Sequence, residues 1–122
     1  NFQKDYFFPL RKLLAARLAA RGVPLPPQTC ERIATAAGYR MLFETAGLRD
    51  IRTEARNMGY ILTDENEWWD VVWNAGFRRL VSQLPAADLP RFRAEHLREV
   101  AALKTKHGLW LDIGVLFTIG QR

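Results

Sequence analysis

Residues 109–119 read Leu-Trp-Leu-Asp-Ile-Gly-Val-Leu-Phe-Thr-Ile and carry the strongest β-strand pattern in the chain. Leu109 and every second residue after it, as far as Ile119, are apolar and share one face of such a strand. The other face also carries apolar residues, among them Trp110 and Leu116. Apolar side chains on both faces are typical of a strand that is covered on two sides. We therefore expect residues 109–119 to form a central strand.

One other segment has a clear strand pattern. From Leu48 to about Ala55, apolar or small residues alternate with charged ones, which indicates a half-exposed strand. Two strands do not make a stable sheet by themselves. The final strand therefore requires neighbours, which come either from a partner chain or from sheet strands outside these residues. The sequence predicts on this ground that the chain associates with itself.

Four further segments are expected to be helical, because apolar residues recur in them at helical spacing. They are residues 5–21, 29–46, 64–84 and 88–107, and the second is expected to break near Gly38. The expected N-caps are Asp5, Thr29, Asp64 (or Thr63) and Asp88. A proline-rich stretch after Gly22 enforces an extended connection between the first two helices.

The composition bounds the class of protein. Hydrophobic residues make up 48% and charged residues 25%, which is typical of a globular chain rather than a disordered one. The net charge of +5 is scattered along the sequence, which disfavours a nucleic-acid partner. No apolar stretch approaches the ~20 residues that span a bilayer, and no signal-peptide pattern is present. A single cysteine, Cys30, excludes an internal disulfide framework and fits a cytoplasmic location.

The motifs of common active sites are missing from the sequence. It contains no P-loop, no dinucleotide-binding loop and no Cys/His ligand set. His96 and Glu99 are interpreted as surface residues of a helix rather than half of a metal site, so no metal is expected. Cys30 has no histidine near it in sequence, and Ser82 lacks a nucleophile-elbow pattern. No catalytic residue can be assigned from these patterns.

Aromatic residues cluster in one expected helix, which contains Trp68, Trp69, Trp73 and Phe77. Two interpretations are open: the helix is buried by its tryptophan face, or the aromatic side chains form an apolar wall over a hydrophobic substrate. A second aromatic group lies near the start of the chain. Its members, Phe2, Tyr6, Phe7 and Phe8, form either a second wall or a contact surface for another domain.

Residues 42–51, Leu-Phe-Glu-Thr-Ala-Gly-Leu-Arg-Asp-Ile, resemble the helix-to-strand step Leu-x-x-x-Ala-Gly-Phe-x-x-Val that occurs late in class I S-adenosylmethionine-dependent methyltransferases. Leu48 stands where phenylalanine is commonest in that family. The helix that carries Trp68 and the segment from Gly108 to Phe117 also look like the C-terminal region of this family. The likeness is greatest to the small-molecule methyltransferases of the ubiquinone and menaquinone biosynthesis type.

The resemblance implies an α+β fragment of an α/β Rossmann-like fold. Such a fragment is mostly helical and ends in an antiparallel β-hairpin that a helical insertion interrupts. The single domain expected for residues 1–122 then has four parts. Residues 1–28 form a substrate-covering helix and a Pro-rich linker, 29–63 a helix and a strand, 64–107 the helical insertion, and 108–122 the final strand.

The same resemblance implies the ligands. In the family, the Gly-rich cofactor loop and the acidic residue that holds the ribose precede this region, and nothing in this sequence matches them. S-adenosylmethionine is therefore expected in the parent protein, none is expected on this chain alone, and no cofactor-binding residue is assigned. The substrate is expected to be a small apolar or aromatic molecule. The expected pocket residues are Phe7, Phe8, Tyr60, Trp69, Trp73 and Phe77.

Two other hypotheses remain beside the methyltransferase. The aromatic excess also fits a self-standing helical module that binds a ligand or dimerises without catalysis. The positive charge fits a nucleic-acid module, whose binding would weaken steeply with salt. On the sequence alone we rank the methyltransferase first, the ligand-binding or dimerisation module second and the nucleic-acid module third.

Overall fold

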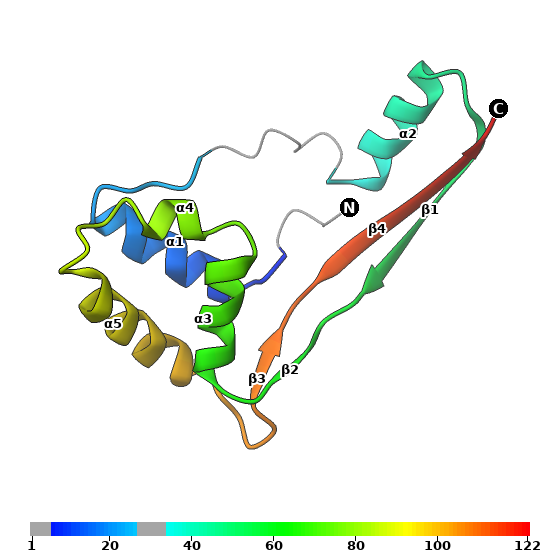
Figure 1. The fold of residues 1–122 in the computed structure, drawn as a ribbon. Helices are drawn as coiled ribbons and strands as arrows, with labels where there is room; N and C mark the ends of the chain where they lie inside the picture. Colours follow the sequence, from blue (N-terminus) through cyan, green and yellow to red (C-terminus); the bar gives the residue numbers. More distant parts are fainter. Residues whose placement is uncertain (1–5, 27–33) are drawn as a thin grey trace. The chain divides into compact units, whose positions relative to one another are not determined.

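The computed structural model describes residues 6–26 and 34–122, which form an α+β structure with five helices and an antiparallel pair of longer strands (Figure 1). Contacts within the chain gather into two compact units. The first, here called the hairpin unit, contains residues 34–59 and 112–122 together with Tyr6 and Phe7. The second, here called the helical unit, contains residues 8–26 and 60–111. Each unit is described by itself.

The hairpin unit consists of α2 (Ala36–Thr45), β1 (Arg49–Asn57) and β4 (Gly114–Gln121). β1 and β4 pair antiparallel, in a register that runs from Arg49 opposite Gln121 to Asn57 opposite Gly114. The register shifts near Asp50, which has a φ of 51°. Because 52 residues from β2 to β3 lie between these two strands in the chain, they form the interrupted antiparallel hairpin that the resemblance predicted.

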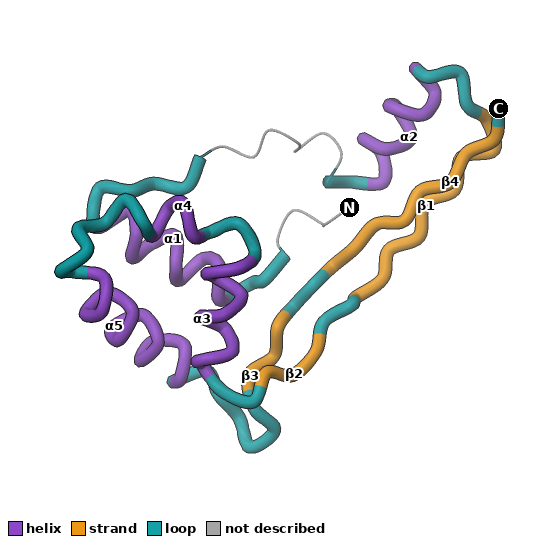
Figure 2. Tube along the Cα trace, viewed as in Figure 1, coloured by secondary structure: helices purple, strands orange, loops and turns teal. Residues whose placement is uncertain are grey.

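A second pair of short strands belongs to the helical unit. β2 (Tyr60–Leu62) pairs antiparallel with β3 (Leu109–Leu111). The expectation of one unbroken strand over residues 109–119 is therefore wrong, since the chain leaves the strand conformation between β3 and β4 (Figure 2).

Hydrogen bonds to Asp112 explain why the strand is interrupted between β3 and β4. Its backbone carbonyl accepts from the Phe7 N–H (2.6 Å), and its carboxylate accepts from the Asn57 side-chain amide (2.7 Å). The opposite strand breaks at the matching place, because the Asn57 side-chain oxygen accepts from the Gly59 N–H at 2.8 Å and so forms an Asx turn. A polar turn residue on each strand thus ends the ladder at the same point.

The burial of β4 differs from the expectation for a strand covered on both faces. Gly114 and Leu116 are buried, whereas Phe117 and Ile119 are 46% and 71% exposed. The covered face lies against α2 and the loop after it, because a Cβ atom placed on Gly120 would lie 2.9 Å from the Phe43 ring. In the described residues the apolar face of β4 therefore stays open to solvent.

The helix α2 is shorter than its expected range. It begins after Thr35, whose hydroxyl oxygen accepts from the Gly38 N–H at 3.0 Å and so caps the helix. It then continues through Gly38 to Thr45, so the expected break is absent. The cap predicted at Thr29 lies outside the described residues. None of the α2 side chains is buried.

The helical unit packs α1 (Leu10–Ala20), α3 (Glu65–Asn74), α4 (Arg78–Val81) and α5 (Leu89–Ala101) around one apolar core. Leu10, Leu14 and Leu18 are fully buried, which confirms the stripe predicted for the first helix. That helix begins after Pro9, and its predicted cap, Asp5, lies outside the described residues. The other fully buried apolar side chains are Leu62, Trp68, Val72, Val81, Phe92, Val100 and Leu111.

The start of α3 confirms Asp64 as the N-cap. Its carboxylate accepts from the N–H groups of Asn66 (2.9 Å) and Glu67 (3.4 Å), and the Glu67 carboxylate accepts in return from the Thr63 N–H (3.0 Å). The predicted end at residue 84 is wrong. α3 ends at Asn74, since Gly76 takes a left-handed φ of 100° and the short helix α4 follows.

The helix α5 also ends earlier than expected, at Ala101 rather than residue 107. A tight turn replaces its last residues, in which the backbones of Thr105 and Gly108 exchange hydrogen bonds of 2.8 and 3.0 Å. Asp88 precedes the helix as predicted, but its side chain makes no capping hydrogen bond.

Gly108 lies in the turn that leads into β3, and a substitution there is the first testable prediction. Its φ is 114°, and a Cβ atom there would overlap the Leu62 carbonyl oxygen. We expect Gly108→Ala to lower the free energy of unfolding by about 1–3 kcal/mol from backbone strain alone, and by more because of the overlap. The control is Gly76→Ala, since Gly76 has a similar φ of 100° but open space around it. Urea unfolding followed by circular dichroism measures both, and equal losses would contradict the steric account.

Candidate ligand pocket

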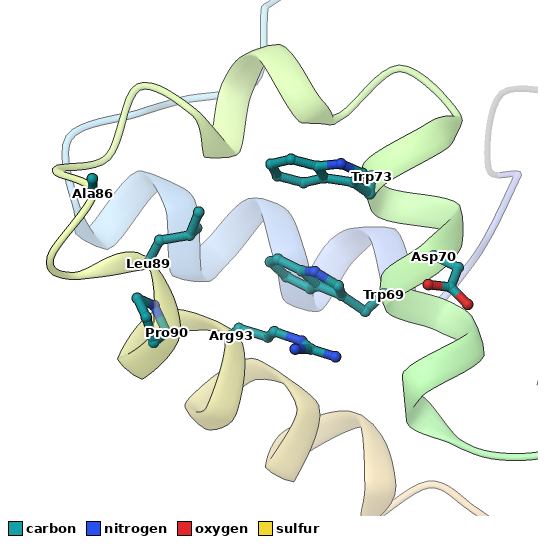
Figure 3. A pocket seen from close by; sticks show the side chains of 7 residues that line it. All are labelled: Trp69, Asp70, Trp73, Ala86, Leu89, Pro90 and Arg93. Atoms are coloured by element: carbon teal, nitrogen blue, oxygen red, sulfur yellow. The ribbon is translucent and has the colours of Figure 1, made fainter.

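An open pocket of about 500 Å³ lies in the helical unit, between α3 and the start of α5 (Figure 3). Its size falls within the range of pockets that hold small molecules, ~300–1,000 Å³. The pocket is lined by Trp69, Asp70, Trp73, Ala86, Leu89, Pro90 and Arg93.

Two tryptophans form the aromatic wall of this pocket. Trp69 and Trp73 are four residues apart on α3, so their side chains leave the same face of the helix. In Figure 3 the two indoles extend side by side from α3 toward the segment that carries Ala86, Leu89 and Pro90. Trp69 is buried and Trp73 is half-buried. The wall is therefore held in place by the core while part of it faces the opening.

Each indole of the wall carries an arginine over its ring. The guanidinium carbon of Arg93 lies 5.7 Å from the ring centroid of Trp69. That of Arg78 lies 4.7 Å from the ring centroid of Trp73. Both distances are within the range of cation–π attraction. The pocket therefore combines a flat apolar wall with positive charge at its margins.

Of the six residues predicted to form a pocket, the structure brings Trp69 and Trp73 together in one. Phe77 is buried instead, with its ring 6.5 Å from that of Trp68, and does not line the pocket. Phe8 and Tyr60 are about half-exposed and also lie outside the lining. Phe7 is buried and belongs to the hairpin unit.

A buried polar pair lies on the core side of α3. The indole N–H of Trp68 donates to Nε2 of His96 at 2.9 Å, and both side chains are fully buried. Because Trp68 can only donate, Nε2 carries no proton and the neutral ring is protonated on Nδ1. That Nδ1 lies 3.5 Å from the Glu99 carboxylate, which is long for a hydrogen bond. The prediction that His96 is a surface residue is wrong, since it lies in the core and faces Trp68.

Arg17 binds the two carboxylates that lie near His96 on α5. Arg17 of α1 donates to Glu99 at 2.7 Å and to Glu95 at 3.0 Å, and so connects α1 with α5. The hydrogen bond from Arg17 holds the pKa of Glu99 below its usual value. Burial lowers the pKa of His96, although the neighbouring Glu99 partly opposes that shift. At neutral pH, His96 is therefore uncharged and Glu99 ionised.

The described lining of the pocket offers an apolar surface and two charged groups to a ligand. Among these described lining residues, the charged groups are one carboxylate, Asp70, and one guanidinium, Arg93, and there is no histidine, cysteine or serine. Among the residues that the structure describes, no group of acidic, histidine and cysteine side chains could hold a metal ion. The described residues do not fit S-adenosylmethionine either, since no strand among them runs through a Gly-rich turn into a helix that could receive it.

The chain matches no protein-family model, no curated protein and no solved structure. Within residues 6–26 and 34–122, no helix has the length and apolar character needed to cross a membrane.

Proposed function

We propose that this chain is the C-terminal, substrate-facing region of an S-adenosylmethionine-dependent methyltransferase, and that the pocket beside Trp69 and Trp73 holds a small apolar or aromatic substrate. The observation that carries the proposal is the aromatic wall itself, a pair of tryptophans that line an open pocket of ligand size. The position of this wall supports it. In the chain, the helices of residues 65–101 come between the two partner strands of each antiparallel pair, as expected for a helical insertion in the family hairpin.

In this proposal the chain contributes positioning and desolvation. S-adenosylmethionine supplies the electrophilic methyl group, from residues of the parent protein outside this chain, and the chain alone is not active. A flat substrate packed on the indole of Trp73 loses water from one face and most of its rotational freedom. We propose a cytoplasmic location for the parent protein, because a chain with a single cysteine fits a reducing compartment.

The test of ligand binding uses the aromatic wall. We expect the chain to bind 2-naphthamide, a neutral bicyclic probe, and Trp73→Ala to weaken that binding about tenfold, because an aromatic contact and its buried area are lost. Isothermal titration calorimetry measures the affinity. The control is Trp110→Ala, since Trp110 is also partly exposed but does not line the pocket. Equal affinities for the wild type and both variants would contradict the proposal.

The methyltransferase part of the proposal needs a separate test. In the complete gene product, transfer of a labelled methyl group from S-adenosylmethionine to small aromatic acceptors should fall when Trp73 is replaced by Ala. Binding of S-adenosylmethionine itself should stay unchanged, because no described residue of this chain is expected to hold it. A complete gene product that neither binds nor consumes S-adenosylmethionine would refute the methyltransferase while leaving the ligand pocket standing.

A second candidate property, self-association, is favoured by the open face of the hairpin unit. On β4, Phe117 and Ile119 of this face are 46% and 71% exposed. A monomer leaves such apolar surface in water at a cost of roughly 25 cal/mol per Å². We expect the isolated chain to form dimers at micromolar concentration in analytical ultracentrifugation, and Ile119→Lys to shift the equilibrium to monomer. A stable, folded wild-type monomer under the same conditions would contradict this prediction.

A further inference from the structure

We infer that the ligand of this pocket is a planar apolar molecule that carries an anionic group, such as an aromatic carboxylate, and that Arg93 recognises this group. The inference rests on the proposed function, because it names the class of molecule that the pocket takes.

The position of Arg93 leaves its hydrogen-bond donors available. Its guanidinium lies over the Trp69 ring, with 5.7 Å between the guanidinium carbon and the ring centroid, and the residue is exposed. A guanidinium attracted to the face of an indole keeps its in-plane N–H groups for other partners. These in-plane N–H groups match the two oxygens of a carboxylate. Arg93 is thus held at the pocket wall with its donors free for a ligand.

The charges around Arg93 do not neutralise it. Glu95, the nearest acidic residue along α5, accepts from Arg17 at 3.0 Å and from Arg91 at 3.1 Å. Glu99 accepts from Arg17 at 2.7 Å. In the part of the chain that the structure describes, no carboxylate forms an ion pair with Arg93. An anionic ligand would supply the missing partner.

The alternative of a cationic ligand is disfavoured by the same wall. A cationic ligand would be repelled by the guanidinium groups of Arg93 and Arg78, which lie over Trp69 and Trp73. Asp70 is the one acidic residue in the described part of the lining, and in Figure 3 its carboxylate projects away from the two indoles. The pocket therefore offers an apolar surface to a ring and a positive charge beside it.

The experiment compares two probes of the same shape on the full chain. We expect 2-naphthoate to bind about three- to tenfold more tightly than 2-naphthamide, as for a partly exposed ion pair, and the difference to shrink in high salt. Arg93→Gln should remove the preference for 2-naphthoate over 2-naphthamide. The matched control is Arg91→Gln, on the same helix and 79% exposed in its side chain, which should keep the preference.

The outcomes separate this inference from the proposed function. Equal binding of both probes to the wild type would overturn the anionic ligand while the aromatic pocket stands. A preference that survives in Arg93→Gln would overturn the role of Arg93. Failure of both probes to bind a chain that circular dichroism shows to be folded would overturn the pocket and this inference together.

Discussion

Replacing Trp68 with Ala is expected to lower the free energy of unfolding by about 3–5 kcal/mol, the typical cost of truncating a fully buried tryptophan. The side chain is completely buried between α3 and α5, and it also donates the hydrogen bond to His96. The substitution leaves a cavity and an imidazole nitrogen without its donor. Since small domains are stable by only ~5–15 kcal/mol, we expect much of the variant to be unfolded at 37 °C.

Two further variants separate packing from hydrogen bonding at this position. Trp68→Phe keeps an aromatic ring but leaves Nε2 of His96 without a donor, which should cost about 1–3 kcal/mol beyond the loss of ring volume. Trp73→Ala, on the next turn of α3, should cost clearly less because Trp73 is only half-buried. Urea unfolding followed by circular dichroism gives all three values. If Trp68→Ala and Trp73→Ala lose the same stability, the division of α3 into a core face and a pocket face is wrong.

Acidification below pH 6.5 is expected to destabilise the protein through His96. Burial lowers the pKa of this histidine below its ordinary value of 6.5, so the unfolded chain takes up a proton before the folded chain does. The contribution of His96 to the free energy of unfolding is constant above pH 6.5. It becomes destabilising as the pH falls from 6.5 toward the lower pKa of the folded state. The slope cannot exceed about 1.4 kcal/mol per pH unit for one proton. Protonation of His96 on Nε2 also destabilises the folded state directly, because that nitrogen could no longer accept the hydrogen bond from Trp68.

Glu99 adds a second acid-sensitive step at lower pH. The hydrogen bond from Arg17 lowers the pKa of Glu99 from 4.5. Its stabilising contribution is present above pH 4.5 and is lost as the pH falls through the folded pKa. Because this carboxylate is partly exposed, we expect the second step to be smaller than the first.

The control for the pH prediction is His96→Gln. A glutamine side-chain oxygen can accept the Trp68 N–H without titrating, so this variant should show a flat stability between pH 6.5 and 5. Glu99→Gln should keep the His96 step and lose the step at lower pH. A His96→Gln variant that loses stability with the same slope as the wild type would refute the assignment to His96.

The sequence predicted those features of the fold that depend on neighbouring residues. The capping of α3 by Asp64 and the leucine stripe of α1 follow from spacing and local hydrogen bonds, and the structure confirms both. The end of α3 was missed because Pro85 is the more obvious stop signal. The helix instead ends at Asn74, just before Gly76 with its positive φ. The break at Asp112 was missed because it depends on hydrogen bonds from Phe7 and Asn57, which are distant in sequence.

The sequence predicted the aromatic residues of the candidate site but not the residues that other helices bring to it. Trp69 and Trp73 were expected in a pocket, and both line one. Arg93 was not expected, although an arginine on a helix that packs beside an aromatic cluster is a recognisable signal of a cation–π contact. His96 was misplaced on the surface because the orientation of α5, which sequence spacing cannot give, decides which of its faces meets Trp68.

The pairing of β2 with β3 fixes the two ends of residues 60–111 next to each other, since Tyr60 lies opposite Leu111. Antiparallel partners are separated by only ~5 Å between Cα atoms. Pairing of β2 with β3 closes residues 60–111 into a loop. The entropy cost of closing such a loop rises only slowly with the number of residues in it. Insertions and deletions in loops that lie before the turn of residues 105–108 should be tolerated as length variants, and a different recognition element could be grafted onto the same base.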